Sequence, residues 1–235
     1  MATTSRNARG PRLGTQFRGK LAAAYGQRGV GPNSLWYVYS PRSQSDWVLR
    51  SDLEWDHFVL TESDPTIMSC SYEPAKQSLS LNGQMLEIPV DAIITYSDGR
   101  VEWRQVRFAG GERDEQSPAT RQLNERIAAA RYAGVAYKLW TEESIRRNAI
   151  RLANWRRAIA WMAAARDRSL AAYQDELRQA LRSKSSLTLG QIESMFGEAS
   201  FGLYAAAAFG ELQRGIYVSN LDEMPLSLHT VIQLR

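Results

Sequence analysis

Two strand-like segments joined by a tight turn place the strongest constraint on the fold. Residues 90–96 and 100–108 are both rich in apolar side chains, and the Ser-Asp-Gly sequence between them predicts an antiparallel pair. Asp91 begins the first segment ahead of Ala-Ile-Ile, and the second segment carries Gln105 and Arg107. Because side chains alternate between the two faces of a strand, we expect Gln105 and Arg107 on one face, beside Asp91.

Further strands and helices surround this pair, and together they predict an α/β fold. Short strands are expected at residues 35–39, 67–72, 77–81, 84–88 and 135–140, with an Asn-Gly turn between the third and the fourth. Helices are expected at residues 46–61, 118–133 and over most of 143–181. Strands that alternate with helices in this way are typical of a sheet covered by helices.

The last stretch, residues 187–235, predicts a small α+β unit. Thr188 is placed to cap a helix that ends at Gly197, and a second helix is expected at residues 200–213. Two short alternating segments follow, which completes the order of a winged helix. The second helix has almost no basic or amide side chains, which base readout requires. It is therefore better suited to close packing or to a protein partner.

Charge is unevenly distributed along the chain. The net charge is +4, but residues 1–50 contain eight Arg or Lys against one acid. Residues 51–102 reverse the balance, and arginines return in residues 146–157. A polyanion such as DNA would be attracted to the two basic flanks. The plainer alternative is a charge distribution that serves solubility, with a disordered basic arm at residues 1–33.

Several classes of protein are disfavoured by composition. One cysteine and two histidines do not supply a Cys- or His-based zinc site. No apolar run approaches the roughly 18 residues of a membrane span, and the N-terminus lacks the apolar region of a signal peptide. We therefore expect a bacterial cytoplasmic protein that does not associate with membranes.

The polar residues of the strand pair suit metal-dependent cleavage of phosphodiester bonds. That chemistry needs oxygen ligands for Mg²⁺ and positive charge to stabilise the transition state. Asp91 and Gln105 offer oxygen atoms at the sheet, and Glu54 offers a third from a helix that must pack on it. Taken singly, Glu54 is better explained as a solvated helix residue, and Gln105 and Arg107 are compatible with an ordinary exposed strand face.

With these residues in place, the chain resembles the TnsA endonuclease family of heteromeric cut-and-paste transposons. The resemblance runs over residues 46–145. It includes a Leu-Glu helix followed by Thr-Glu-Ser-Asp-Pro, a Pro-x-Asp strand, an Asp-Gly turn, Gln-x-Arg, and a closing Gly-Val-x-Tyr-x-Leu-Trp-Thr-Glu-Glu. A C-terminal winged helix is also a family trait.

The resemblance implies a restriction-endonuclease-like mixed sheet flanked by helices, followed by a small α+β winged-helix domain. It implies cleavage at the 5′ ends of the element, beside a DDE transposase subunit and an AAA+ ATPase regulator, with double-stranded DNA as substrate. Glu54, Asp91 and Gln105 would hold Mg²⁺, for which Mn²⁺ is expected to substitute, and Arg107 would take the place of the catalytic lysine. The implied organisation is a basic arm and docking segment at residues 1–45, a nuclease domain at 46–145, a helical connector at 146–186, and the winged helix at 187–235.

Two further functions stay open, and Arg107 favours the first of them. An arginine keeps the positive charge and can hold a phosphate, but it cannot give up its proton to act as a base. One alternative is therefore a catalytically inactive DNA-binding and assembly subunit on a nuclease-like scaffold. The other is a related nuclease of a defence or repair system, which the neighbouring genes would distinguish.

Overall fold

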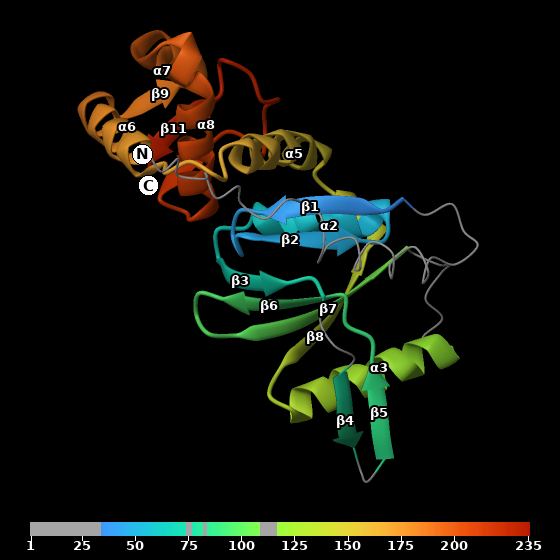
Figure 1. Cartoon of the computed structure of the whole chain (residues 1–235). Helices are drawn as coiled ribbons and strands as arrows, with labels where there is room; N and C mark the ends of the chain where they lie inside the picture. Colours follow the sequence, from blue (N-terminus) through green and yellow to red (C-terminus); the bar gives the residue numbers. More distant parts are fainter. Residues whose placement is uncertain (1–33, 74–76, 82–83, 109–116) are drawn as a thin grey trace, which may run out of the picture.

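The computed structural model describes residues 34–73, 77–81, 84–108 and 117–235. The predicted arm at residues 1–33 lies outside this part of the chain. Seven helices and eleven strands are formed within it, which confirms a mixed α/β fold (Figure 1). Among the described residues, no helix combines the length and the apolar character that crossing a bilayer requires.

The central sheet has four strands in the order β3-β6-β7-β8. Strand β6 pairs antiparallel with β7, and β7 pairs parallel with β8, so the sheet is mixed. The predicted turn between β6 and β7 is confirmed, and Gly99 adopts φ +85° there, a conformation that favours glycine. The strands are β3 (Ile67–Ser71), β6 (Ala92–Tyr96), β7 (Val101–Arg107) and β8 (Ala136–Thr141).

Two helices cover opposite faces of this sheet. Helix α2 (Asp52–Glu62) lies above it in Figure 1, and α3 (Pro118–Tyr132) lies below it. On the α3 side, Trp103 of β7 packs in an apolar cluster with Ala129 and Ala130. On the α2 side, Arg104 contacts α2 instead. The alternation expected for β7 is therefore realised.

The predicted start of the first helix is wrong. Residues 45–49 form strand β2 (Ser45–Leu49), which pairs antiparallel with β1 (Trp36–Ser40), and the helix begins only at Asp52. Ser51 is its cap, because its hydroxyl accepts a hydrogen bond from the Glu54 N–H at 3.1 Å. The apolar run before Ser51 fits a strand as well as a helix turn, and pairing with β1 decides between the two.

A separate hairpin packs near α3. Strands β4 (Gln77–Leu81) and β5 (Gln84–Ile88) form an antiparallel pair, as predicted. The Asn-Gly turn between them lies outside the described residues. Apolar side chains of the hairpin join the cluster that contains Trp103, so the hairpin extends the α3 side of the core.

The helical stretch that follows β8 divides into three helices rather than running continuously. Asn148 caps α5, and residues 165–170 separate α5 from α6. Thr141 caps the start of α4, and Asn148 divides α4 from α5 because its side chain accepts from a first-turn backbone N–H of the new helix. The helices are α4 (Glu142–Arg146), α5 (Ala149–Ala164) and α6 (Ala171–Lys184).

The C-terminal elements have the predicted order with one added strand. Thr188 forms a capping box at the start of α7, and Gly197 ends it with φ +87°. The added strand is β9, which joins a three-stranded sheet in the order β10-β11-β9. The elements are β9 (Ser186–Thr188), α7 (Leu189–Phe196), α8 (Glu198–Gln213), β10 (Tyr217–Ser219) and β11 (Val231–Leu234).

Helix α8 is a buried packing element, as its composition predicts. Its residues from Tyr204 to Phe209 are all buried, and its ring contacts include Phe209 with Trp161 of α5. Buried side chains of β1, α2, α5 and α8 belong to one apolar cluster. The predicted domain boundaries stay predictions. The shared cluster shows that β1, α2, α5 and α8 pack around one core.

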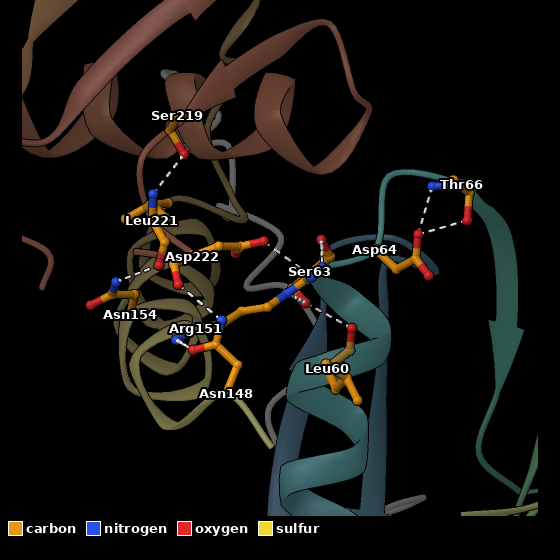
Figure 2. Close-up of polar contacts among 10 residues, drawn as sticks. All are labelled: Leu60, Ser63, Asp64, Thr66, Asn148, Arg151, Asn154, Ser219, Leu221 and Asp222. Carbon is orange, nitrogen blue, oxygen red and sulfur yellow. Dashed lines mark hydrogen bonds and ion pairs between the residues drawn. The ribbon is translucent and has the colours of Figure 1, made fainter. Parts of the chain in front are cut away.

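Polar contacts hold the loop between β10 and β11 against α5 (Figure 2). Arg151 donates to the hydroxyl and carbonyl oxygens of Ser63, both at 2.9 Å, and forms an ion pair with Asp222 at 3.3 Å. Asn154 donates to the carbonyl oxygens of Leu221 and Met224, both at 2.7 Å. Side chains of α5 therefore connect the end of α2 to the C-terminal unit.

Candidate metal centre

Asp91 is fixed at the point where β6 enters the sheet. Its backbone N–H donates to the carbonyl oxygen of Arg104 at 2.8 Å, which extends the β6–β7 pairing by one residue. Its Oδ2 accepts a hydrogen bond from the backbone N–H of Val106 at 2.7 Å. The carboxylate is therefore held against β7 between Gln105 and Arg107.

Gln105 and Arg107 meet on one face of β7. Gln105 is buried, with 3% of its surface exposed, whereas Arg107 is exposed. The amide of Gln105 lies between the Tyr137 hydroxyl, 2.7 Å away, and the Arg107 guanidinium, whose Nη2 and Nε are at 2.8 and 2.9 Å. A guanidinium only donates hydrogen bonds, so the amide atom that faces it is the oxygen.

Glu54 reaches the same region from the first turn of α2. Its Oε2 accepts from the backbone N–H of Arg50 at 2.7 Å. Burial raises the pKa of Glu54, and repulsion from the Asp91 carboxylate raises it further. That repulsion places the two carboxylates in each other's electrostatic field.

Burial also raises the pKa of Asp91, and three groups oppose the rise. They are the Val106 N–H, the Arg107 guanidinium and the Arg50 guanidinium.

Each of the two carboxylates, Glu54 and Asp91, uses one oxygen to accept a backbone hydrogen bond. Within the described ranges, Oε1 of Glu54 and Oδ1 of Asp91 accept none.

Asp91 therefore lies beside Gln105 and Arg107 at one end of the sheet, with Glu54 within its electrostatic field, and the oxygen atoms of the acids and the amide are of a type that suits a hard cation. Two carboxylates and one amide oxygen are ligands of the kind that Mg²⁺ and Mn²⁺ take. Among the described residues, no group of three or more His, Cys, Asp or Glu is placed to hold a metal. The arrangement has only two acids, so Gln105 would have to supply the third protein ligand.

Two residues of this region, Arg50 and Tyr137, are not among the predicted site residues. Arg50 acts with Arg107 as a positive charge on Asp91. Tyr137 of β8 contacts Gln105, and burial raises its pKa while the charge of Arg126 opposes the rise. The sequence alone does not predict Tyr137 as a site residue. Its position beside Gln105 depends on the parallel register that pairs Trp103 with Tyr137.

The polar cluster on the other face of β7 connects this strand to α2. Arg104 is buried and contacts the Glu102 carboxylate at 2.6 Å, the Thr61 hydroxyl at 3.1 Å and the His57 ring at 3.4 Å. Burial and the Arg104 charge lower the pKa of His57, so the ring is neutral at pH 7. His57 serves packing between α2 and the sheet, and His229 is exposed in the C-terminal unit.

A scan of this chain against models of known protein families finds no match, and neither does a search of curated proteins. The functional argument therefore depends on the chemistry of this site.

Proposed function

We propose that the chain is a Mg²⁺-dependent DNA endonuclease subunit of a cut-and-paste transposition system. The observation that carries the proposal is the placement of the Asp91 carboxylate against β7 beside Gln105 and Arg107, with Glu54 within its electrostatic field. Three oxygen donors from separate elements, beside two arginines, suit a metal ion that binds a phosphodiester.

The fold is compatible with this proposal. A mixed sheet with a helix on each face and an acid at the entry to a buried strand suits a restriction-endonuclease-like domain. The succession α6, β9, α7, α8, β10 and β11, with β11 central in its sheet, suits a winged helix. Because α8 is buried, we propose that this unit braces the nuclease rather than reading base edges with α8.

Each residue has a separate role in the proposed cleavage. Glu54, Asp91 and Gln105 would hold the ion, and the bound ion would supply charge neutralisation and an activated water. Arg107 and Arg50 would contact the phosphate oxygens, since a guanidinium matches the geometry of two such oxygens. Neither arginine gives up its proton at neutral pH, so the residues of this chain provide positioning and charge rather than a general base.

We place the protein beside a DDE transposase subunit and an AAA+ ATPase regulator, with double-stranded transposon ends as substrate. The basic segments that flank the acidic region support DNA as a partner. Genes for a transposase and an ATPase next to this one would support transposition over defence or repair.

One observation favours a second candidate, a catalytically inactive assembly subunit. Arg107 donates two hydrogen bonds to the Gln105 oxygen, the atom that would coordinate the ion. If Arg107 stays there, the guanidinium occupies the position of the cation and the site is a scaffold.

Binding of Mn²⁺ and strand cleavage together test the proposal. We expect Mn²⁺ to bind the full chain and Asp91→Ala to abolish binding, whereas the exposed turn variant Asp98→Ala binds normally. With the neighbouring transposase and end-containing DNA, the chain and Asp98→Ala should cut and Asp91→Ala should not. We also expect Arg107→Lys to cut faster, because a lysine frees the Gln105 oxygen and can give up a proton. Cleavage that survives Asp91→Ala would contradict the proposal, and a chain that neither binds Mn²⁺ nor cuts would support the scaffold.

A further inference from the structure

Gln105 is a metal ligand only in one of its two amide orientations. A glutamine side chain ends in an oxygen, which can coordinate a hard cation, and an NH₂ group, which cannot. The two ends are similar in shape, so the surroundings must choose between them. A carboxylate at the same position has no such requirement, because both of its ends are oxygen.

The Tyr137 hydroxyl has contacts that make this choice. It lies 3.1 Å from the carbonyl oxygen of Pro89 and 2.7 Å from the Gln105 amide. A carbonyl only accepts, so the single hydroxyl proton is directed to Pro89. The hydroxyl can then only accept from Gln105, and the amide end that faces it is the NH₂ group.

The opposite end of the amide gives the same answer independently. There the Arg107 guanidinium approaches at 2.8 and 2.9 Å, and it requires an acceptor. With the alternative orientation, an NH₂ group would face a guanidinium, and the Tyr137 proton would have to leave Pro89. Both ends of Gln105 therefore direct its oxygen away from Tyr137 and toward Arg107, whose charge also acts on Asp91.

We propose that Tyr137 is a positioning residue that holds the Gln105 amide with its oxygen toward the metal centre. The role rests on the proposed metal-binding function, and it goes through Gln105 rather than through contact with the ion. Pro89 lies two residues before Asp91, so the same hydroxyl also ties the segment that carries Asp91 to the strand that carries Gln105. The Tyr137 hydroxyl thus orients the Gln105 amide and holds the segment that leads to Asp91.

A double-mutant cycle of Mn²⁺ binding by titration calorimetry on the full chain separates positioning from general damage. Tyr137→Phe should weaken Mn²⁺ binding about tenfold, the lower end for loss of a group that orients a ligand. In the Gln105→Glu background the same change should have less than about a twofold effect, because a carboxylate needs no orientation. Tyr217→Phe is the matched control, since its hydroxyl is buried without a hydrogen-bond partner among the described residues, and binding should not change.

A metal-free measurement distinguishes failure of this inference from failure of the proposed function. The side-chain NH₂ signals of Gln105, assigned by their loss in Gln105→Glu, should exchange slowly with water and should exchange faster in Tyr137→Phe. Unchanged exchange, or an equal loss of Mn²⁺ affinity in both backgrounds, would overturn the role of Tyr137. If no protein in the set binds Mn²⁺, the proposed function fails, and the exchange rates still decide the amide orientation.

Discussion

At the scale of single residues, the candidate site works against the stability of the metal-free chain. Glu54 and Asp91 are partly buried carboxylates near each other, and burial is the main reason that both pKa values are raised. Carboxylates whose pKa values are shifted by burial and by each other's charge are typical of residues that perform chemistry.

The substitution Asp91→Asn should make this cost measurable. The folded state holds the Asp91 proton more tightly than the unfolded state, so stability falls as the pH rises from the unfolded pKa through the folded pKa. Asparagine carries no charge but keeps an oxygen for the Val106 N–H. We expect a midpoint of thermal unfolding higher by roughly 2–4 °C at pH 7 without metal. The gain should disappear as the pH approaches about 4, the ordinary Asp value.

The matched control is Asp98→Asn in the exposed turn. Hydrogen bonds from Arg100 hold the pKa of Asp98 below its usual value, so its charge is favourable in the folded state. Neutralising it should give no gain at pH 7. A midpoint for Asp91→Asn that is lower than that of the unchanged chain at pH 7, and no longer lower near pH 4, would show that the Asp91 charge stabilises the metal-free fold.

At the scale of elements, helix α5 organises the C-terminal half. Asn154 is the centre of its contact with the β10–β11 loop, because its amide satisfies three backbone groups at once. It donates to the Leu221 and Met224 carbonyls, and its oxygen accepts from the Leu226 N–H, all at 2.7 Å. A loop with few strand contacts of its own is thereby fixed on the helix.

Asn154→Ala should therefore destabilise the protein strongly. The change leaves three buried backbone groups without their partner, and at about 1 kcal/mol for each the loss is about 3 kcal/mol. Thermal unfolding should shift down by roughly 6–12 °C. Asn124→Ala is the control, since Asn124 is exposed on α3 and alanine favours a helix. Equal midpoints for the two variants would mean that the loop contributes little to stability.

The same scale shows what can be predicted from the sequence. The β6–β7 pair, the α7 cap and the end of α7 at Gly197 depend on local turn and capping chemistry, so short motifs predict them. Strand β2 depends on β1 as a partner, because its apolar run by itself is compatible with either a helix turn or a strand. Tyr137 is not predicted for a related reason. Its contact with Gln105 forms only because β7 and β8 pair in this parallel register.

At the scale of the whole molecule, the site and the C-terminal unit are linked through α2. The first turn of α2 carries Glu54, and its last turn carries Glu62, which is buried and accepts from Gln213 of α8 at 2.7 Å. The two ends of α2 thus lie at the candidate metal centre and against α8.

Anomalous diffraction from crystals soaked in Mn²⁺, with a short DNA duplex bound, tests the central claim most directly. We predict one or more manganese peaks within coordination distance of Glu54, Asp91 and the Gln105 oxygen, with Arg107 moved onto a phosphate. A site without manganese, in which the Arg107 guanidinium still donates to Gln105 beside Asp91, would contradict the nuclease and establish a scaffold subunit.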